Sequence, residues 1–317
     1  MDRLGRCWTM FTSLFKGRRR VRTVGYSAMS VALVAAVAGC GTGGASGSNT
    51  IVVGGKNFTE QLIMANVLKL LIQHDDPKLH VVMKDNLDTN VLWNAMKNGD
   101  VDTYVEYTGT GLVNILHDQV TENPNKAYDE VKQQFEQKYH VTWLKPIGFN
   151  DTYAMVMRAS EAKRLGISTL SGLAAQSPSL TLGTEQNFVS RDDGLPGLEK
   201  VYGAHFKAVK TMEVGLKYEA LIDKKVDVVD GFSTDPEIPE YHLTVLKDNQ
   251  NFFPPYYAVP IIRDSTLQAH PELRGILNKL SGTLDDSQMQ RLNAQVDIDK
   301  KSPSEVAKEW LTQKGLI

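Results

Sequence analysis

Cysteine is scarce in this sequence: only Cys7 and Cys40 occur among 317 residues. Cys7 lies in an N-terminal segment that we expect to be removed, which leaves Cys40 without a cysteine partner. We therefore expect neither a disulfide nor a cysteine-based metal site in the mature protein. The seven histidines are scattered without the spacing of metal ligands, so the sequence indicates no metal and no other cofactor.

Sequence motifs of catalysis are missing as well. The chain has no G-x-S-x-G nucleophile turn, no Walker A loop and no H-E-x-x-H zinc motif. Asp and Glu are plentiful, but most fall on the predicted surfaces of helices. The stretch 99–102 (Gly-Asp-Val-Asp) could suggest a metal site, yet a turn followed by a strand also explains a similar stretch at 224–227. We find no reason to expect an enzyme.

Positive charge is concentrated at the N-terminus. Residues 1–39 carry seven Lys or Arg and one acid, which leaves residues 40–317 with 28 basic and 36 acidic residues, a net charge of −8. An acidic body without a basic patch does not favour nucleic acid as a partner.

The N-terminal segment has the features of an export signal. A basic run at 16–22 precedes an apolar stretch at 28–38, which is too short to span a bilayer. Small residues directly before Cys40 resemble the lipobox of bacterial lipoproteins. The resemblance implies that residues 1–39 are a signal peptide, that Cys40 is lipidated, and that residues 40–49 are a flexible tether. A generic signal peptide with an incidental cysteine is the alternative.

No later stretch approaches 18 apolar residues, so we expect nothing after Cys40 to cross the membrane. Several acyl chains on one cysteine anchor a protein stably, whereas a single chain does so only marginally. The expected location is therefore outside the cytoplasmic membrane, with the lipid as the anchor.

Strand and helix patterns alternate along the body. Short apolar runs at 51–53, 79–83 and 101–105 are separated by segments with helical spacing, the first of which has Thr59 as a plausible N-cap. Strands that alternate with helices imply a parallel sheet. The sequence predicts an α/β fold with parallel-rich sheets flanked by helices.

The same pattern occurs twice. The stretch 95–102, which precedes Tyr107, is matched 125 residues later by 220–227, which precedes Phe232. Three matches in the same order are better explained by two lobes of one fold than by chance. The two shorter matches pair 54–58 with 183–188 and 153–156 with 257–260.

We therefore predict two lobes with a ligand cleft between them, since one ordinary core holds fewer than about 300 residues. Two segments look like crossovers, and an amphipathic helix at 304–316 returns to the first lobe. The predicted first lobe is 50–148 with a return at 258–317, the second is 149–257, and the crossovers are 145–153 and 252–260.

Aromatic residues stand at the predicted strand ends and crossovers. Ligands bind beyond the carboxyl ends of parallel strands, so two facing lobes would place Tyr107 and Phe232 across one cleft. Any one ring alone is more simply a core residue, but their shared position favours a binding site. Each ring face attracts a quaternary ammonium by about 0.5–2 kcal/mol. The rings are Tyr107, Tyr153, Phe232, Tyr256 and Tyr257.

Several motifs follow one another along the body. They are GGKNFTEQ at 54–61, EYTGT at 106–110, NDTY at 150–153, FSTD at 232–235 and FPPY at 253–256. With these motifs, the chain from about residue 50 to the C-terminus resembles the osmoprotectant-binding proteins of bacterial and archaeal ABC importers, the glycine betaine, choline and carnitine group. The resemblance implies a two-lobed type II periplasmic-binding fold that closes on its ligand, with a membrane permease and its cytoplasmic ATPase as partners.

The resemblance implies an aromatic cage at Tyr107, Tyr153, Phe232 and Tyr256. Phe232 departs from the family, which usually has Tyr there, so any hydrogen bond of that hydroxyl is absent. Only one of the adjacent Tyr256 and Tyr257 can face the cleft if the segment is extended. The family pattern selects Tyr256, whereas the internal repeat aligns Tyr257 with Tyr153.

The resemblance also implies polar contacts. The backbone carbonyl of Asp151 would be an added partner for the cationic head, and Lys56, Thr110 and Arg191 would hold a carboxylate. The physical chemistry agrees, because Lys56 precedes a helix N-terminus and Arg191 can clamp a carboxylate with two hydrogen bonds. These cations favour betaines and carnitine over choline.

Other functions stay open at this point. The same fold could bind another small solute such as an amino acid, whose primary ammonium needs hydrogen-bond acceptors as well as rings. A ligand-sensing module of a receptor and a lipoprotein enzyme are alternatives of a different class. We expect a monomer that captures quaternary ammonium osmoprotectants.

Overall fold

The computed structural model describes residues 49–119, 121 and 123–317. These belong to one compact unit, residues 47–317. The predicted signal peptide at 1–39, the predicted lipidation site Cys40 and the tether up to residue 48 lie outside the described residues, so they stay predictions.

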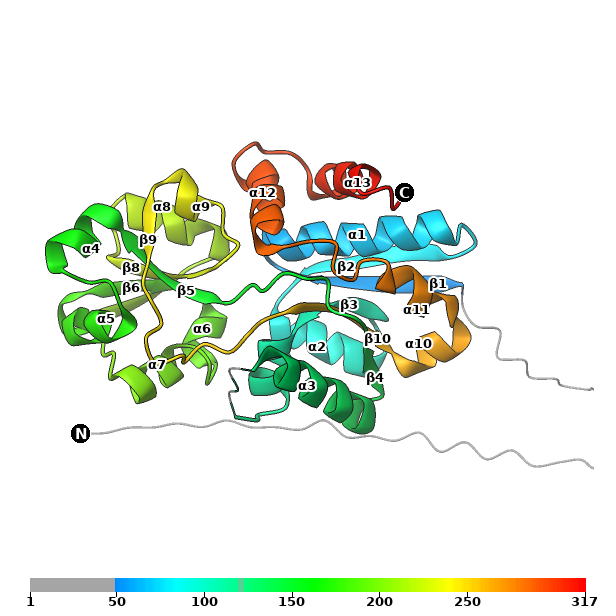
Figure 1. Cartoon of the computed structure of the whole chain (residues 1–317), viewed down its shortest axis with the longest axis horizontal. Helices are drawn as coiled ribbons and strands as arrows, with labels where there is room; N and C mark the ends of the chain where they lie inside the picture. Colours follow the sequence, from blue (N-terminus) through cyan, green and yellow to red (C-terminus); the bar gives the residue numbers. More distant parts are fainter. Residues whose placement is uncertain (1–48, 120, 122) are drawn as a thin grey trace, which may run out of the picture. The chain divides into compact units, whose positions relative to one another are not determined.

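Five strands form the first of two sheets. They are β1 (Thr50–Lys56), β2 (His80–Leu87), β3 (Thr103–Tyr107), β4 (Val141–Trp143) and β10 (Ala258–Arg263). Their order in the sheet is β2-β1-β3-β10-β4 (Figure 1). β1 is parallel to β2 and β3, whereas β10 is antiparallel to β3 and β4.

The second sheet has the same design. Its strands are β5 (Tyr153–Arg158), β6 (Thr181–Thr184), β7 (Ala208–Thr211), β8 (Val228–Phe232) and β9 (Leu243–Val245). The order β7-β6-β8-β5-β9 matches the first sheet strand for strand, with the same parallel and antiparallel neighbours. The predicted internal repeat is therefore present in the fold.

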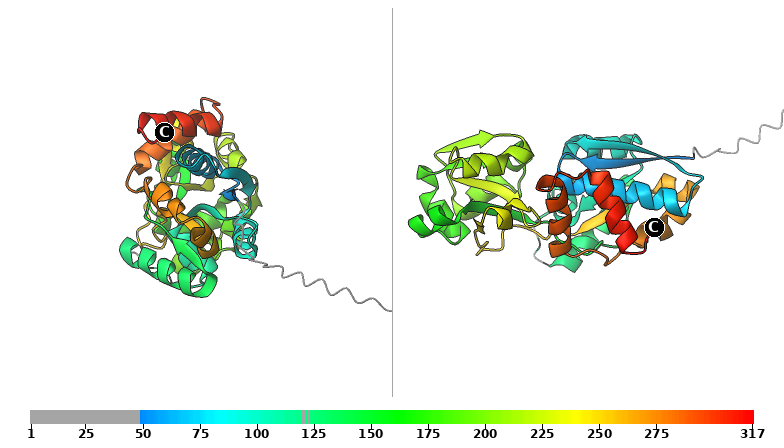
Figure 2. Two further views of the ribbon diagram at one scale, coloured as in Figure 1. Left: turned by 90° about the vertical axis from the view of Figure 1, so that its right-hand side faces the viewer. Right: turned by 90° about the horizontal axis from the view of Figure 1, so that it is seen from above.

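Helices flank both sheets (Figures 1 and 2). With the first sheet are α1 (Thr59–Asp75), α2 (Thr89–Asn98), the π-helical η1 (Thr110–Ile115), α3 (Pro124–Tyr139), α10 (Asp264–Ala269), α11 (Glu272–Asn278), α12 (Asp286–Asp297) and α13 (Pro303–Gln313). With the second are α4 (Ala159–Leu165), α5 (Leu170–Gln176), the 3-10 turn η2 (Ser177–Ser179), α6 (Gln186–Ser190), α7 (Leu195–Tyr202), the 3-10 turn η3 (Val214–Leu216), α8 (Lys217–Ile222) and α9 (Glu237–Glu240).

Both sheets are mixed, which refines the expectation of parallel strands. The chain crosses from one sheet to the other through segments 144–152 and 246–257 (Figure 1). Each crossover delivers a strand at the edge where its neighbour ends, since Ala258 at the start of β10 pairs with Tyr107 at the end of β3. A strand that begins where its neighbour ends must run antiparallel to it.

The register of the repeat differs by one residue from the sequence prediction. Tyr107 pairs with Ala258, and its counterpart Phe232 pairs with Tyr153. Ala258, and not Tyr257, is thus the equivalent of Tyr153. The alignment that favoured Tyr257 for the site is wrong, because antiparallel pairing in space sets the equivalence.

The repeated Val-Asp motif fastens neighbouring strands together. One carboxylate oxygen of Asp102 accepts a hydrogen bond of 2.8 Å from a backbone N–H of β1, and Asp227 accepts one of 2.8 Å from β6. An arginine faces each acid, Arg263 beside Asp102 at 3.7 Å and Arg158 beside Asp227 at 3.6 Å. The motif is structural, as the turn-and-strand interpretation predicted.

Helix α1 is the centre of the first sheet's helical layer. It begins at Thr59, but Phe58 is its N-cap residue and the Thr59 hydroxyl bonds to Asp297 of α12. The predicted capping role of Thr59 is therefore wrong, because a carboxylate from another helix is the acceptor. The predicted C-terminal helix is present as α13, and it packs on α1 through the buried Val306, Trp310 and Leu311 (Figure 2).

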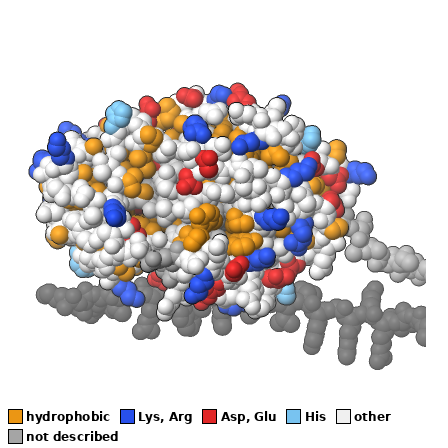
Figure 3. All heavy atoms as spheres, viewed as in Figure 1, with side chains coloured by type: hydrophobic (Ala, Val, Ile, Leu, Met, Phe, Trp, Pro, Cys, Tyr) orange, Lys and Arg blue, Asp and Glu red, His pale blue; other side chains and the backbone are white. Residues whose placement is uncertain are grey.

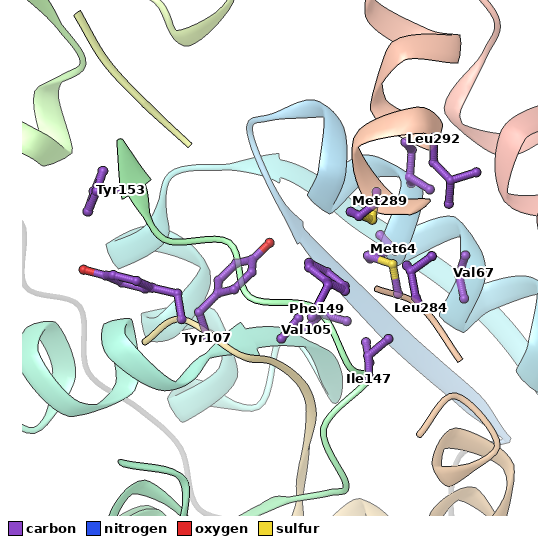
Figure 4. Close-up of a cluster of buried hydrophobic side chains, with 14 of the residues drawn as sticks. Met64, Val67, Val105, Tyr107, Ile147, Phe149, Tyr153, Leu284, Met289 and Leu292 are labelled. Atoms are coloured by element: carbon purple, nitrogen blue, oxygen red, sulfur yellow. The ribbon is translucent and has the colours of Figure 1, made fainter. Parts of the chain in front are cut away.

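The hydrophobic core continues to the ends of the strands. Met64 of α1, Phe149 of the first crossover and Met289 of α12 pack in one cluster, which also includes Tyr107 and Tyr153 (Figure 4). The aromatic residues predicted for the site are thus held from behind by the core.

Within the described residues, no helix has the length and apolar character needed to cross a membrane. On the face in Figure 3, basic and acidic side chains of the described residues are interspersed.

Candidate functional site

One cavity is lined by residues from both sheets and from the crossovers. Tyr107 ends β3, Phe232 ends β8 and Tyr153 begins β5. Tyr256 lies two residues before the start of β10. The structure therefore brings together all eight residues that the resemblance assigned to the ligand. The lining residues are Lys56, Asn57, Phe58, Thr89, Tyr107, Thr110, Asp151, Tyr153, Glu185, Asn187, Arg191, Phe232 and Tyr256.

Five aromatic rings converge on this cavity. Phe232 stacks between Phe58 and Tyr153, with ring centroids 5.5 and 5.2 Å away. Tyr256 meets Tyr153 edge-on, with centroids 5.6 Å apart and planes at 86°. Tyr107 lies 6.3 Å from Phe58. The arrangement presents ring faces and edges from both halves of the fold to one point.

The cavity that these rings border is small, about 30 Å³. Phe58 and Phe232, which come from different halves of the fold, stack directly with ring centroids 5.5 Å apart. A trimethylammonium group therefore fits between these two rings only if they move apart. The two halves of the fold supply different rings, which makes a relative movement of the halves the simplest way to do this.

Tyr256 is held in place by a carboxylate and a glycine. Its hydroxyl donates to Asp193 at 2.6 Å. A Cβ on Gly109 would lie 2.6 Å from the Tyr256 ring, so only glycine allows the ring this position. Tyr257, by contrast, donates its backbone N–H to Thr108 and is not among the described lining residues.

Lys56 is a buried cation at the end of β1. Its side chain is 3% exposed and forms an ion pair with Glu106. The ammonium nitrogen also lies 4.8 Å from the centroid of the Tyr107 ring. Burial lowers the pKa of Lys56, and the neighbouring Glu106 opposes that shift.

Arg191 is a second buried cation, placed just after α6. It forms an ion pair with Asp193, and its guanidinium nitrogens lie 3.4 Å from the Thr110 hydroxyl oxygen. Arg191 and Lys56 each have a buried carboxylate partner. A ligand carboxylate would therefore join existing ion pairs rather than meet an isolated cation.

Asp151 enters the cavity from the first crossover. Its backbone N–H donates to the carbonyl of Tyr256 at 3.0 Å, and its carboxyl group contacts the Thr234 hydroxyl at 2.6 Å. Burial raises the pKa of Asp151 well above its usual range, and the nearby Glu60 adds to the shift. The side chain of Asp151, and not only its carbonyl, therefore belongs to this region.

The sequence reasoning missed five lining residues: Asn57, Phe58, Thr89, Glu185 and Asn187. The repeat match of 54–58 with 183–188 pointed to both loops, but a short match does not show which side chains face inward. Burial raises the pKa of the Glu185 carboxyl.

Lys217 lies close to the Phe232 ring. Its ammonium nitrogen is 5.1 Å from the ring centroid and 2.9 Å from a carboxylate oxygen of Asp230. Both side chains of this ion pair are 0% exposed. A buried ion pair of the second half thus borders one of the rings of the cage.

Among the described residues, no group of three or more His, Cys, Asp and Glu side chains has the geometry to hold a metal ion. The arrangement suits non-covalent capture of a small solute with a cationic, non-hydrogen-bonding head.

Two α/β sheets of one strand order, joined by two crossovers and sharing an aromatic-lined cavity, define a type II solute-binding protein. The chain belongs to the OpuAC family, the substrate binding domain of ABC-type glycine betaine transport systems, which matches residues 49–313. This confirms the family resemblance and the fold class. The protein is the extracytoplasmic substrate-binding component of an ABC importer for quaternary ammonium solutes, and not an enzyme.

Relatives and solved structures agree with this assignment. The chain is 41% identical over 271 residues to the carnitine transport binding protein OpuCC of Listeria monocytogenes, covering 84% of this chain and 88% of that protein. It is 36% identical to the ergothioneine transport permease/ergothioneine binding protein EgtU of Helicobacter pylori, covering 84% of this chain and 48% of the relative. A crystal structure of a glycine betaine/carnitine/choline ABC transporter protein is similar at a TM-score of 0.68 with 37% identity, covering 84% of this chain and 99% of that one.

Proposed function

We propose that this protein captures glycine betaine and related betaines, carnitine and choline in the cage of Tyr107, Tyr153, Phe232 and Tyr256, and delivers them to a membrane permease. The observation that carries the proposal is the convergence of these rings, with Phe58 as a fifth, on one cavity. Four rings at about 0.5–2 kcal/mol each supply several kcal/mol. Micromolar binding requires about 8 kcal/mol.

A carboxylate on the ligand is assigned to Lys56, Thr110 and Arg191. Arg191 and Thr110 already contact each other in the cavity wall, and Arg191 offers a planar fork that matches a carboxylate. The carbonyl of Asp151 is assigned to the cationic head. The acids paired with Lys56 and Arg191 offset their charge, so the cations can serve zwitterionic ligands without excluding cationic ones.

Capture is proposed to work by closure of two lobes, 50–148 with 258–317 and 149–257, about the two crossovers. The rings in contact across the cavity support this, since they must separate to admit a ligand and close again around it. The closed form then docks on the permease, which a cytoplasmic ATPase drives. We propose that the protein acts as a monomer held to the membrane by a lipid on Cys40, after cleavage of residues 1–39.

Titration calorimetry of residues 47–317 tests the ligand assignment directly. We expect saturable binding of glycine betaine, carnitine and choline and none of arginine. Ergothioneine is included among the tested ligands because the relative EgtU is named an ergothioneine binding protein. Folded protein that binds none of the quaternary ammonium compounds would mean that the rings serve packing alone.

Tyr153 tests the cage itself. Tyr153→Ala removes a ring face and should weaken binding of glycine betaine by more than about 1 kcal/mol, whereas Tyr153→Phe keeps the ring and should cost less. Tyr241, which is 44% exposed, provides the control: Tyr241→Ala should bind as the unmodified protein does. Equal affinity in Tyr153→Ala and in the unmodified protein would contradict the cage.

A further inference from the structure

Thr234 joins two buried carboxyl groups. Its hydroxyl oxygen lies 2.7 Å from Oε2 of Glu60 and 2.6 Å from Oδ1 of Asp151. A hydroxyl has a single hydrogen and donates one hydrogen bond, so the second short contact needs a hydrogen from a carboxyl group. Glu60 and Asp151 therefore hold one proton between them.

The other hydrogen bonds of the pair do not supply that hydrogen. The Tyr107 hydroxyl lies 2.6 Å from Oε1 of Glu60. Gln61 donates to the same Tyr107 oxygen at 2.9 Å, which directs the Tyr107 hydrogen toward Glu60. Neither Tyr107 nor Gln61 therefore supplies a hydrogen to the contact between the Thr234 hydroxyl and the second carboxyl.

The surroundings favour holding the proton. Glu60 and Asp151 border a second cavity of about 190 Å³, beside the aromatic cage. Asp235, Glu237 and Asp297 line it too, and within the described part of the chain no Lys, Arg or His does. Burial raises the pKa of Glu60 to about 7. Burial and the neighbouring acids thus disfavour a second negative charge on the pair of Glu60 and Asp151.

The cations closest to this region are engaged elsewhere. Lys56 on β1 acts on Asp151 through space but is ion-paired with Glu106. Lys217 on α8 acts on Asp235 and is ion-paired with Asp230. From α12, Asn293 offers an amide nitrogen 3.5 Å from Glu60, which is a neutral donor.

The proton-sharing pair is in direct connection with the ligand cavity. Asp151 lines both cavities, and Phe58 and Phe232 form the wall between them. Glu60 is bonded to Tyr107, a ring of the proposed cage. A cation held by these rings would feel the charge of the pair through a buried, water-poor region.

We propose that Glu60 and Asp151, sharing one exchangeable proton through Thr234, set the preference of this site between cationic and zwitterionic quaternary ammonium ligands. This rests on the proposed function, because it concerns the head of a ligand held in that cage. Glu60 acts here as a positioning residue for the proton and does not touch the ligand.

The direction of the effect follows from charge. At low pH the pair holds its proton and carries one negative charge. As pH rises the proton leaves and the pair carries two, which attracts a cation such as choline more strongly than the neutral zwitterion glycine betaine. Any effect of the lost proton on closure is common to both ligands and cancels in their ratio. The ratio of choline to glycine betaine association constants therefore rises with pH.

Calorimetric titration of residues 47–317 at several pH values between about 5.5 and 8.5 measures this ratio. We expect a rise of at most about tenfold per pH unit, the limit for one released proton. Repeating the choline titration in buffers of different ionisation enthalpy should show a fractional proton released, with little or none for glycine betaine. A ratio that does not change with pH would overturn the proposal while leaving ligand capture intact.

Two substitutions test the assignment to the pair. Glu60→Gln and Asp151→Asn each remove the exchangeable proton with little change in shape, and either should flatten the pH dependence of the ratio. Glu237→Gln is the matched control. Glu237 lines the same cavity and burial raises its pKa to about 7, but no described hydrogen bond ties it to Thr234. Loss of the pH dependence in Glu237→Gln alone would overturn the proposal.

A measurement without ligand separates this inference from the proposed function. A protonated carboxyl has an infrared carbonyl band distinct from that of a carboxylate. Other buried carboxyls such as Glu237 contribute to this band as well, so the test compares variants. We expect a component of the band near neutral pH that both Glu60→Gln and Asp151→Asn remove and that Glu237→Gln keeps. If no quaternary ammonium binds but this component behaves in this way, ligand capture fails and the shared proton stands. If ligands bind and neither Glu60→Gln nor Asp151→Asn changes the band, the shared proton is wrong.

Discussion

Buried charges at the residue scale are arranged in pairs around the cage. Lys56 with Glu106, Arg191 with Asp193, and Lys217 with Asp230 each bring a cation near an aromatic ring together with its own acid. Breaking such a pair leaves a lone buried charge, which costs far more than the pair contributes. Each pair therefore keeps its cation in place beside an aromatic ring of the cage.

The Lys217 pair provides a stability test. Lys217→Met leaves Asp230 buried without its cation and should lower the free energy of unfolding by about 3–5 kcal/mol. Removing both charges, in Lys217→Met with Asp230→Asn, should recover part of the loss. Urea unfolding measures both.

The control for Lys217 is Lys225, whose ion pair with Asp223 is exposed on the same half of the fold. Lys225→Met should leave the free energy of unfolding nearly unchanged, because ion pairs between exposed side chains contribute little. Equal losses for the two lysines would show that burial of the pair is not what matters.

At the element scale, both sheets join neighbouring elements by the same set of contacts, which we call the aspartate–arginine device. In both sheets an aspartate after a helix-ending turn bonds a backbone N–H of the neighbouring strand, and an arginine from the crossover strand faces it. Gly99, in the turn that ends α2, has a φ of +83°. The device thus ties a helix end, a parallel strand and an antiparallel strand together.

Gly99→Ala should reveal how tightly these elements are joined. The left-handed conformation costs an alanine about 1–2 kcal/mol. The new Cβ would also lie 2.8 Å from a guanidinium nitrogen of Arg263, which faces Asp102. Gly203 ends α7 with a φ of +71° and no atom within 4 Å of such a Cβ. Gly99→Ala should therefore lower the melting temperature more than Gly203→Ala. An equal drop would contradict the tight joining of these elements at Gly99.

At the scale of the whole molecule, the two crossovers are the segments about which the halves are expected to move. The crossovers 144–152 and 246–257 connect the sheets and carry Asp151 and Tyr256 into the cavity. Because the proposed ligand contacts come from both halves and from the crossovers, we expect closure and binding to be coupled.

Closure should be visible in solution. We expect the radius of gyration of residues 47–317, measured by small-angle X-ray scattering, to fall when glycine betaine is added at saturating concentration, and to stay constant with arginine. The physical reason is that the ligand contributes contacts only when both halves reach it. A radius that does not respond to a ligand shown to bind would argue against closure about the crossovers.

Much of the fold could be predicted from the sequence because its signals are local. The spacing of apolar residues marked the strands and helices, and the 125-residue repeat of Tyr107 and Phe232 predicted two similar halves. The register of the crossover strands was not predictable to one residue, since it depends on pairing between Tyr107 and Ala258 across a long stretch of chain. The predicted capping role of Thr59 is wrong for the same reason, because its hydroxyl donates to Asp297 of α12, which is far away in the sequence.

The sequence by itself determined the fold class, the family and eight of the residues that meet at the cavity, because each is written in short motifs near strand ends. Only the tertiary structure decided what surrounds them: Phe58 as a fifth ring, a carboxylate partner for each buried cation, and the bridge of Thr234 to Glu60, 174 residues apart in the chain. Burial and charge at a site are sums over neighbours from distant segments, and those neighbours meet only when the chain has folded.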